Sequence, residues 1–199
     1  MHVVRIAALL SLLVLGACQS SARIDPVDHP EYAKLKPEIV RLVTKMRSCQ
    51  GPALYVALQE LVAYDIFAVD LVSKLVEDPN PRLRSNALWV LYQINDPEYP
   101  KVQENIDGLL IDSLDDPDRL VRFEAASGLV SRNKWEHIPV LFEGLRDPSA
   151  AVRFSCHATL QDVTAQNFGF AVDGETDDRE QALVRWCEWY EDWRSRTRG

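Results

Sequence analysis

A metal-binding site is the first chemistry to test, because histidine and acidic side chains are common protein ligands of metal ions. Glu136 and His137 are adjacent at an expected helix start, but one such pair supplies too few ligands for a metal centre. An acidic run resembles a calcium-binding loop in charge alone: Asp173, Glu175, Asp177 and Asp178. It lacks the glycine position and the distal bidentate glutamate that such a loop needs. We therefore predict no metal site and no cofactor.

The sequence shows none of the common catalytic motifs. The sequence has no glycine-rich phosphate loop and no Gly-x-Ser-x-Gly nucleophile elbow. Its paired carboxylates lie at expected turns and on exposed helix faces, where charged residues are usual. We therefore predict no catalytic residues and no enzyme activity, although an enzyme with a diffuse site would leave no such motif.

Composition and charge place the chain among ordinary globular proteins. It has 199 residues, of which 47% are hydrophobic and 26% are charged, which fits one globular domain. The formal net charge is -8 at pH 7. An acidic surface disfavours nucleic acids and anionic lipid headgroups, because binding to either needs cationic side chains. We therefore predict no nucleic-acid partner.

Residues 1–17 have the composition of an export signal. Arg5 is the only charged residue among them, and residues 6–15 are apolar apart from Ser11. Such a run is too short to span a bilayer stably and is typical of a signal peptide. The polar, proline-containing residues 18–31 follow, and we predict that they form a flexible tether. The folded body is then expected to cover residues 32–199.

The segment Leu15-Gly16-Ala17-Cys18 resembles the lipobox of bacterial lipoproteins. This resemblance implies that Cys18 is lipidated, that the chain is cut before it, and that the mature protein is anchored to a membrane. Gln19 stands where an aspartate tends to retain such lipoproteins in the inner membrane, so the resemblance implies the outer membrane, facing the periplasm. The alternative is a secreted protein that is cut after Ala17.

Three later segments, 71–91, 110–129 and 141–160, repeat one pattern. Each has an apolar stretch, an Asp-Pro pair and an apolar residue followed by Arg. A small residue comes four positions after that apolar residue, and a Leu comes four further on. A degenerate copy at 42–61 lacks the Asp-Pro pair and the Arg. The spacing is that of amphipathic helices, so each copy predicts a pair of helices, with an inserted loop around 96–100.

The repeats resemble the HEAT family, and in particular its short, bacterial, lyase-type HEAT-like repeats. This resemblance implies an all-α fold, a short right-handed α-solenoid of about four helical hairpins that bury their apolar faces on one another. In the family, the repeated Arg and the turn Asp form a structural ladder between adjacent repeats. The resemblance carries that role to Asp78, Arg84, Asp116, Arg122, Asp147 and Arg153.

Capping signals predict the helix boundaries. Each Asp-Pro pair fits the start of a second helix, with Asp as the N-cap and Pro in the first turn. Near the C-terminus, Asp178 with Gln181 resembles a capping box, which predicts a helix over residues 179–196. We expect residues from about 172 to 197 to cap the last repeat, because terminal repeats need a cover. Residues 167–170 would form the connecting loop.

Three cysteines follow Cys18, and an exported protein can form disulfides. Cys156 occupies the small-residue position of the last repeat, and Cys187 lies in the expected capping helix. A disulfide between them could therefore join the cap to the repeats. The alternative is that Cys156 is a small buried residue with a free thiol. Cys49 would then be an odd thiol near a turn.

The exposed face of the second helices is the candidate partner-binding surface, and in the HEAT family this face lines the concave side. Positions two residues before or after each small residue point away from the expected core. Several hold aromatic side chains, which suit protein binding. The candidates are Tyr55, Trp89, Phe123 and Phe154, with Trp189 on the capping helix. The alternative is that these rings pack between neighbouring repeats.

Together these features predict a non-catalytic, lipid-anchored scaffold of the cell envelope that binds an unidentified protein or peptide. One alternative is an enzyme-associated or maturation factor, as the lyase-type HEAT-like proteins imply. Export would separate the chain from the bilin substrates of those proteins, which favours the scaffold. The other alternative is a purely structural envelope component.

Overall fold

The described part of the chain is helical throughout. In this computed structural model residues 25–197 are described, and every regular element among them is an α-helix or a short 3-10 helix. The prediction of an all-α fold is confirmed. None of the described helices is long and apolar enough to cross a membrane. The predicted signal peptide and Cys18 lie outside the described residues.

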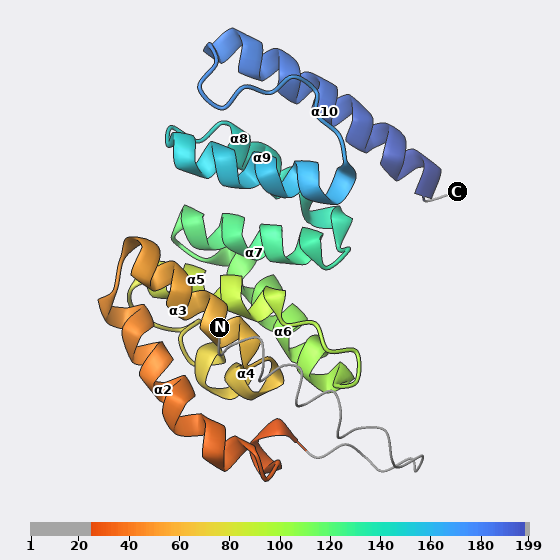
Figure 1. The fold of residues 1–199 in the computed structure, drawn as a ribbon. Helices are drawn as coiled ribbons and strands as arrows, with labels where there is room; N and C mark the ends of the chain where they lie inside the picture. Colours follow the sequence, from red (N-terminus) through yellow and green to blue (C-terminus); the bar gives the residue numbers. More distant parts are fainter. Residues whose placement is uncertain (1–24, 198–199) are drawn as a thin grey trace. The chain divides into compact units, whose positions relative to one another are not determined.

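The chain divides into two compact units, and the first is Met1–Leu109. Its elements are η1 (Pro26–Asp28), α2 (Tyr32–Ser48), α3 (Gly51–Ala63), α4 (Ile66–Ser73), α5 (Pro81–Gln93) and α6 (Pro100–Asp112), which ends just beyond the unit (Figure 1). α2 packs on α3 and α4 packs on α5, so this unit holds two helical hairpins. α2 also contacts α4, and α3 contacts α5, as expected of two neighbouring copies of one helix pair. Residues 94–99 form the predicted loop.

The second unit, Leu110–Gly199, is built around another hairpin. Its elements are η2 (Ser113–Asp115), α7 (Arg119–Ser131), η3 (Trp135–His137), α8 (Ile138–Leu145), α9 (Ala150–Thr164) and α10 (Thr176–Thr197). α8 and α9 pack together, and α7 packs against both. α10 packs on α8 through an apolar cluster centred on the fully buried Trp186.

The start of α10 differs from the prediction. The helix begins at Thr176, so Asp177 and Asp178 lie in its first turn and Asp178 is not the N-cap. The predicted capping box is therefore wrong. Acidic residues are favourable both at the N-cap and throughout the first turn, where they face the positive end of the helix dipole. The residue types alone therefore could not show whether Asp178 is the N-cap or lies in the first turn.

The Asp-Pro pairs also lie outside the second helices, which corrects the predicted N-caps. The observed N-caps of α5, α7 and α9 are Asn80, Asp118 and Ser149. In each repeat the Asp carboxylate two residues earlier accepts the N–H of that N-cap residue, at 2.8–3.0 Å. These Asx turns satisfy a backbone donor just before the helix, so the Asp stabilises the turn and not the helix itself.

The repeated Arg closes the same turn from the other side. One guanidinium nitrogen (Nη1) donates to two carbonyl oxygens, that of the Asp six residues earlier and that of the Pro five residues earlier. The same pair of bonds recurs for Arg84, Arg122 and Arg153, with N–O distances of 2.7–3.3 Å. The repeated Arg therefore contacts its own repeat.

The contact to the preceding repeat comes from a different Arg. Arg47 at the end of α2 pairs with Asp78 at 2.6 Å, and Arg119 at the start of α7 pairs with Asp147 at 2.7 Å. The pKa of Asp78 is lowered, first by the Asn80 N–H and then by Arg47. Asp78 and Asp147 thus each bridge two repeats, and their Arg partners lie outside the repeated pattern.

Close helix packing explains the small residue of the last repeat. A Cβ added at Gly144 of α8 would collide with the Sγ of Cys156 on α9, so both positions must stay small. Burial raises the pKa of the Cys156 thiol to about 12, which makes it unreactive. In the structure Cys156 is a buried free thiol and Cys187 is an exposed one on α10, so the disulfide between them stays a prediction.

Residues 25–31, which the sequence assigns to the tether, belong to the folded body. Asp25 caps η1 by accepting the Val27 N–H at 3.1 Å, and η1 contacts both α2 and α4. The His29 ring lies edge-on to Phe67 of α4, with 5.4 Å between the ring centroids. Two prolines and an apparent lack of periodicity concealed this packing in the sequence.

Candidate functional site

The five aromatic residues predicted to bind a partner have different environments in the structure. Tyr55 on α3 and Phe154 on α9 are 59% and 63% exposed, so these two rings are available to a partner. Trp89 on α5 and Trp189 on α10 are half-buried. Phe123 on α7 is buried in the core of the second unit.

Phe123 is therefore not a surface residue, and that prediction is wrong. Its ring lies 3.5 Å from the position that a Cβ on Gly144 would occupy, beside Cys156. The two small residues leave space that the phenyl ring fills. The angle of Phe123 on its own helix predicts an outward direction, but the size of residues on neighbouring helices decides whether the ring is covered.

Trp189 belongs to an aromatic cluster that joins α10 to the rest of the second unit. Its ring centroid lies 5.8 Å from that of Trp186, 6.3 Å from Trp135 and 6.4 Å from Phe168. Phe168 lies in the loop before α10 and contacts Trp186 edge-on at 4.8 Å. Trp189 thus packs between segments of one unit, which is the alternative left open by the sequence.

An aromatic surface on the first unit brings together two predicted residues and one that the prediction missed. The ring centroids of Tyr55 on α3 and Trp89 on α5 are 6.3 Å apart, and those of Trp89 and Tyr92 are 6.5 Å apart. The three rings form one row across adjacent second helices, and we call Tyr55, Trp89 and Tyr92 the aromatic row. The side-chain amide of Gln59 donates to the Tyr55 hydroxyl at 3.0 Å and holds that ring in place.

The aromatic row has the side chains of a binding surface. Tyrosine and tryptophan offer large apolar faces with a polar hydrogen-bonding group at one edge. Such residues are enriched among those that contribute most to protein interfaces.

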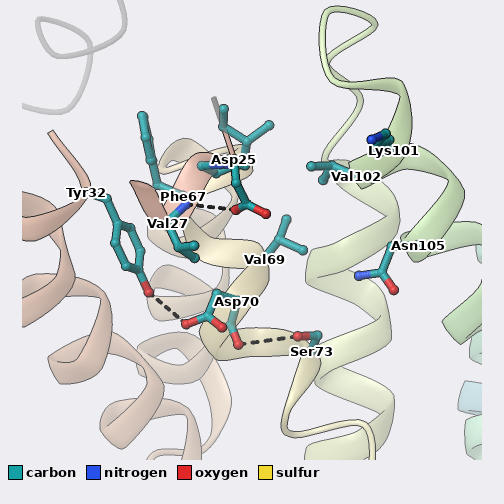
Figure 2. Close-up of a pocket in the computed structure, with 12 residues that line it drawn as sticks. Asp25, Val27, Tyr32, Phe67, Val69, Asp70, Ser73, Lys101, Val102 and Asn105 are labelled. Carbon is teal, nitrogen blue, oxygen red and sulfur yellow. Dashed lines mark hydrogen bonds between the residues drawn. The ribbon is translucent and has the colours of Figure 1, made fainter. Parts of the chain in front are cut away.

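A pocket of about 360 Å³ lies elsewhere in the first unit, between η1, α2, α4 and α6 (Figure 2). This volume is within the usual range for small-molecule sites. Its apolar lining comprises Pro26, Val27, Ile66, Phe67, Val69 and Val102. Its polar lining comprises Asp25, Tyr32, Asp70, Ser73, Lys101 and Asn105.

Asp70 organises the polar side of this pocket. The Tyr32 hydroxyl donates to its Oδ2 at 2.8 Å, and Lys74 donates to its Oδ1 at 2.9 Å. Burial, the largest single effect, favours a raised pKa for Asp70, but the hydrogen bonds from Lys74 and Tyr32 outweigh it and lower the pKa. Burial and then Asp70 itself raise the pKa of Tyr32 to about 12. At neutral pH the carboxyl is ionised and the phenol keeps its proton.

The sequence held one signal for this pocket that the sequence analysis did not use. Asp70 is the single charged residue of α4, whose other residues are nearly all apolar. An acid inside an apolar helix must find partners or solvent. The identity of those partners depends on η1, α2 and α6, which no local pattern could reveal.

No group of three or more His, Cys, Asp or Glu side chains in residues 25–197 is arranged to hold a metal ion. The acidic residues between 173 and 178 lie in the turn before α10 and in its first helical turn. Comparison of the sequence with known proteins found no matching family model and no similar curated protein.

Proposed function

We propose that this protein is a lipid-anchored, non-catalytic scaffold of the cell envelope that holds another protein or peptide on its second helices. The aromatic row carries the proposal, because Tyr55 and Trp89 come from neighbouring second helices and Tyr55 is 59% exposed. Groups of exposed aromatic rings suit protein binding.

The proposed architecture is a short right-handed α-solenoid of about four HEAT-like hairpins, with α10 as its C-terminal cap. Three repeats share the same Asx turn and the same Arg-to-carbonyl bonds, which supports a common origin for the hairpins. Stacked hairpins of this kind present their second helices as one continuous surface. In the second unit, Phe154 is a 63% exposed ring on the second helix α9.

Site-specific photocrosslinking in intact cells tests the binding surface. A photoreactive benzoylphenylalanine in place of Tyr55 or Tyr92 is expected to give adducts of the same mass, because both positions would touch one partner. The matched control is Val40, which is 45% exposed on α2, a first helix of the same unit. An adduct of equal yield at Val40, or none at Tyr55 and Tyr92, would contradict the proposed surface.

The membrane anchor is tested separately, through the Leu15-Gly16-Ala17-Cys18 motif. Cells fed an alkyne fatty acid are expected to label the wild-type protein, and Cys18→Ser is expected to abolish the label and release the protein from the membrane fraction. The matched control is Cys49→Ser, which should keep the label. A mature wild-type protein that carries no fatty acid would refute the anchor and leave the binding surface untouched.

A further inference from the structure

The pocket of the first unit presents mainly hydrogen-bond acceptors along η1, α2 and α4. The Tyr32 hydroxyl donates its hydrogen to the Asp70 carboxylate at 2.8 Å, and the Ser73 hydroxyl donates to the Asp70 carbonyl at 3.3 Å. A hydroxyl has one hydrogen to donate, so both can offer a ligand only their lone pairs. The Asp25 carboxylate is an acceptor of the same kind, whereas the Asp70 carboxylate is already held by Tyr32 on Oδ2 and by Lys74 on Oδ1, at 2.9 Å.

Asp25 adds a charge that solvent and ligand can reach. One carboxylate oxygen, Oδ1, accepts the Val27 N–H at 3.1 Å, and the side chain is exposed at the edge of the pocket. Figure 2 shows Asp25 directed toward the space above Val69 and Asp70. A ligand group there would meet an acceptor with spare lone pairs and a full negative charge.

The remaining lining is apolar and suits a hydrocarbon stem. Val27, Phe67 and Val69 line one side, and Val102 faces them from α6. The pocket therefore combines a carboxylate acceptor at its edge, Asp25, with an apolar wall.

We infer that this pocket binds a cation carried on an apolar stem, namely an alkylguanidinium or alkylammonium group such as an arginine or lysine side chain bears. Only such a group supplies several N–H donors, a positive charge and a methylene stem together. The chain's net charge of -8 would also attract cations toward it. This inference does not depend on the aromatic row or on the membrane anchor.

Lys101 provides the sharpest test, because it lies at the rim of the same pocket on α6. A bound cation would be repelled by Lys101, so Lys101→Met should tighten binding of a cation. A bound anion would instead be held by Lys101, and the same substitution should weaken its binding. A cationic and an anionic ligand thus predict opposite changes in binding affinity for Lys101→Met.

The experiment titrates the mature full-length protein with three small probes that share one stem: butylguanidine, butylurea and pentanoate. Chemical shifts of the backbone amides of η1, α4 and α6 report binding. Butylguanidine is expected to bind, and the uncharged butylurea is expected to bind about tenfold more weakly, since a charge-assisted hydrogen bond is lost. Asp25→Asn should weaken butylguanidine binding by a similar factor, whereas Lys101→Met should strengthen it. The matched control is Asp28→Asn, an exposed acid of η1 outside the pocket lining, which should leave binding unchanged.

Three results would overturn the inference: no shifts with butylguanidine, equal binding of butylurea, or pentanoate as the preferred probe with its binding lost in Lys101→Met. An equal loss in Asp28→Asn and Asp25→Asn would do the same, because it would indicate general attraction of cations by an acidic surface.

A further arm compares butylguanidine with acetyl-Gly-Arg-Gly-amide. Tighter binding of the peptide would identify a protein side chain as the source of the cation, and tighter binding of butylguanidine would identify a free amine-type ligand.

Discussion

Replacement of Trp186 by alanine is expected to lower the free energy of unfolding of the second unit by about 3–5 kcal/mol, the usual cost of a buried Trp→Ala change. The Trp186 side chain is fully buried, and its ring contacts Phe168 at 4.8 Å and Phe142 at 6.4 Å between centroids. These contacts join α10 to α8 and to the loop before α10. The substitution removes the side chain on which the three segments converge and leaves a large cavity.

Hydrogen exchange of the full chain, with mass spectrometry of its peptides, measures this effect unit by unit. Peptides from α8, α9 and α10 should lose protection in Trp186→Ala, whereas peptides from α3 and α5 should keep it. The control is Val184→Ala on the same helix; Val184 is 54% exposed, so its loss should change stability by no more than about 0.5 kcal/mol. Equal effects of the two substitutions would show that α10 does not depend on this buried contact.

The aromatic cluster around Trp186 also contains a buried histidine. His157 on α9 is 7% exposed and lies among Phe170 and Trp186, with centroid distances of 5.0 Å and 6.4 Å. Burial lowers the pKa of this histidine, so the neutral form is the folded one. The His157 side chain therefore adds no charge to this cluster. Opening the cluster would expose the rings of Phe170 and Trp186 and the neutral imidazole to water.

The sequence predicts the helical pairs well, because the repeated apolar spacing is a local property of each helix. It predicts the turns less well. Asp78 before Pro79 looks like an N-cap, yet its carboxylate accepts the Asn80 N–H and the helix begins at Pro81. An Asx turn and an N-cap use the same residue types one or two positions apart, so composition cannot separate them.

The candidate site was less predictable than the fold, because it depends on contacts between distant segments. Tyr55 and Trp89 were predicted from their angles on single helices, and their neighbours leave Tyr55 exposed and Trp89 half-buried. Phe123 has the same angle as Tyr55, but Cys156 and Gly144 admit its ring to the core. The pocket was missed because it forms only where η1, which the sequence reads as a tether, packs on α4.

Arg153 has the second large expected effect, because this buried side chain does more than close its own turn. Its Nη1 donates to the carbonyls of Asp147 at 2.8 Å and Pro148 at 3.0 Å. Its Nε also donates to the carbonyl of Val172, at 2.9 Å, in the loop before α10. The side chain is buried, so Arg153→Met would keep the stem and leave three carbonyls without this donor. We expect a loss of about 3 kcal/mol, since hydrogen bonds to charged groups contribute about 1.5–3 kcal/mol each and are not additive.

Arg122→Met is the matched control, because Arg122 makes the same two turn contacts, to Asp116 and Pro117, at 2.7 and 3.1 Å. It is less buried than Arg153 and has no counterpart of the Val172 bond among its described contacts, so a loss of about 1.5 kcal/mol is expected. Urea unfolding of the two variants gives the difference, and hydrogen exchange should show that only Arg153→Met exposes the amides of residues 170–174. Equal losses would mean that both arginines act through their turns alone. In that case the link from α9 to the cap would depend on the aromatic cluster and not on this buried guanidinium.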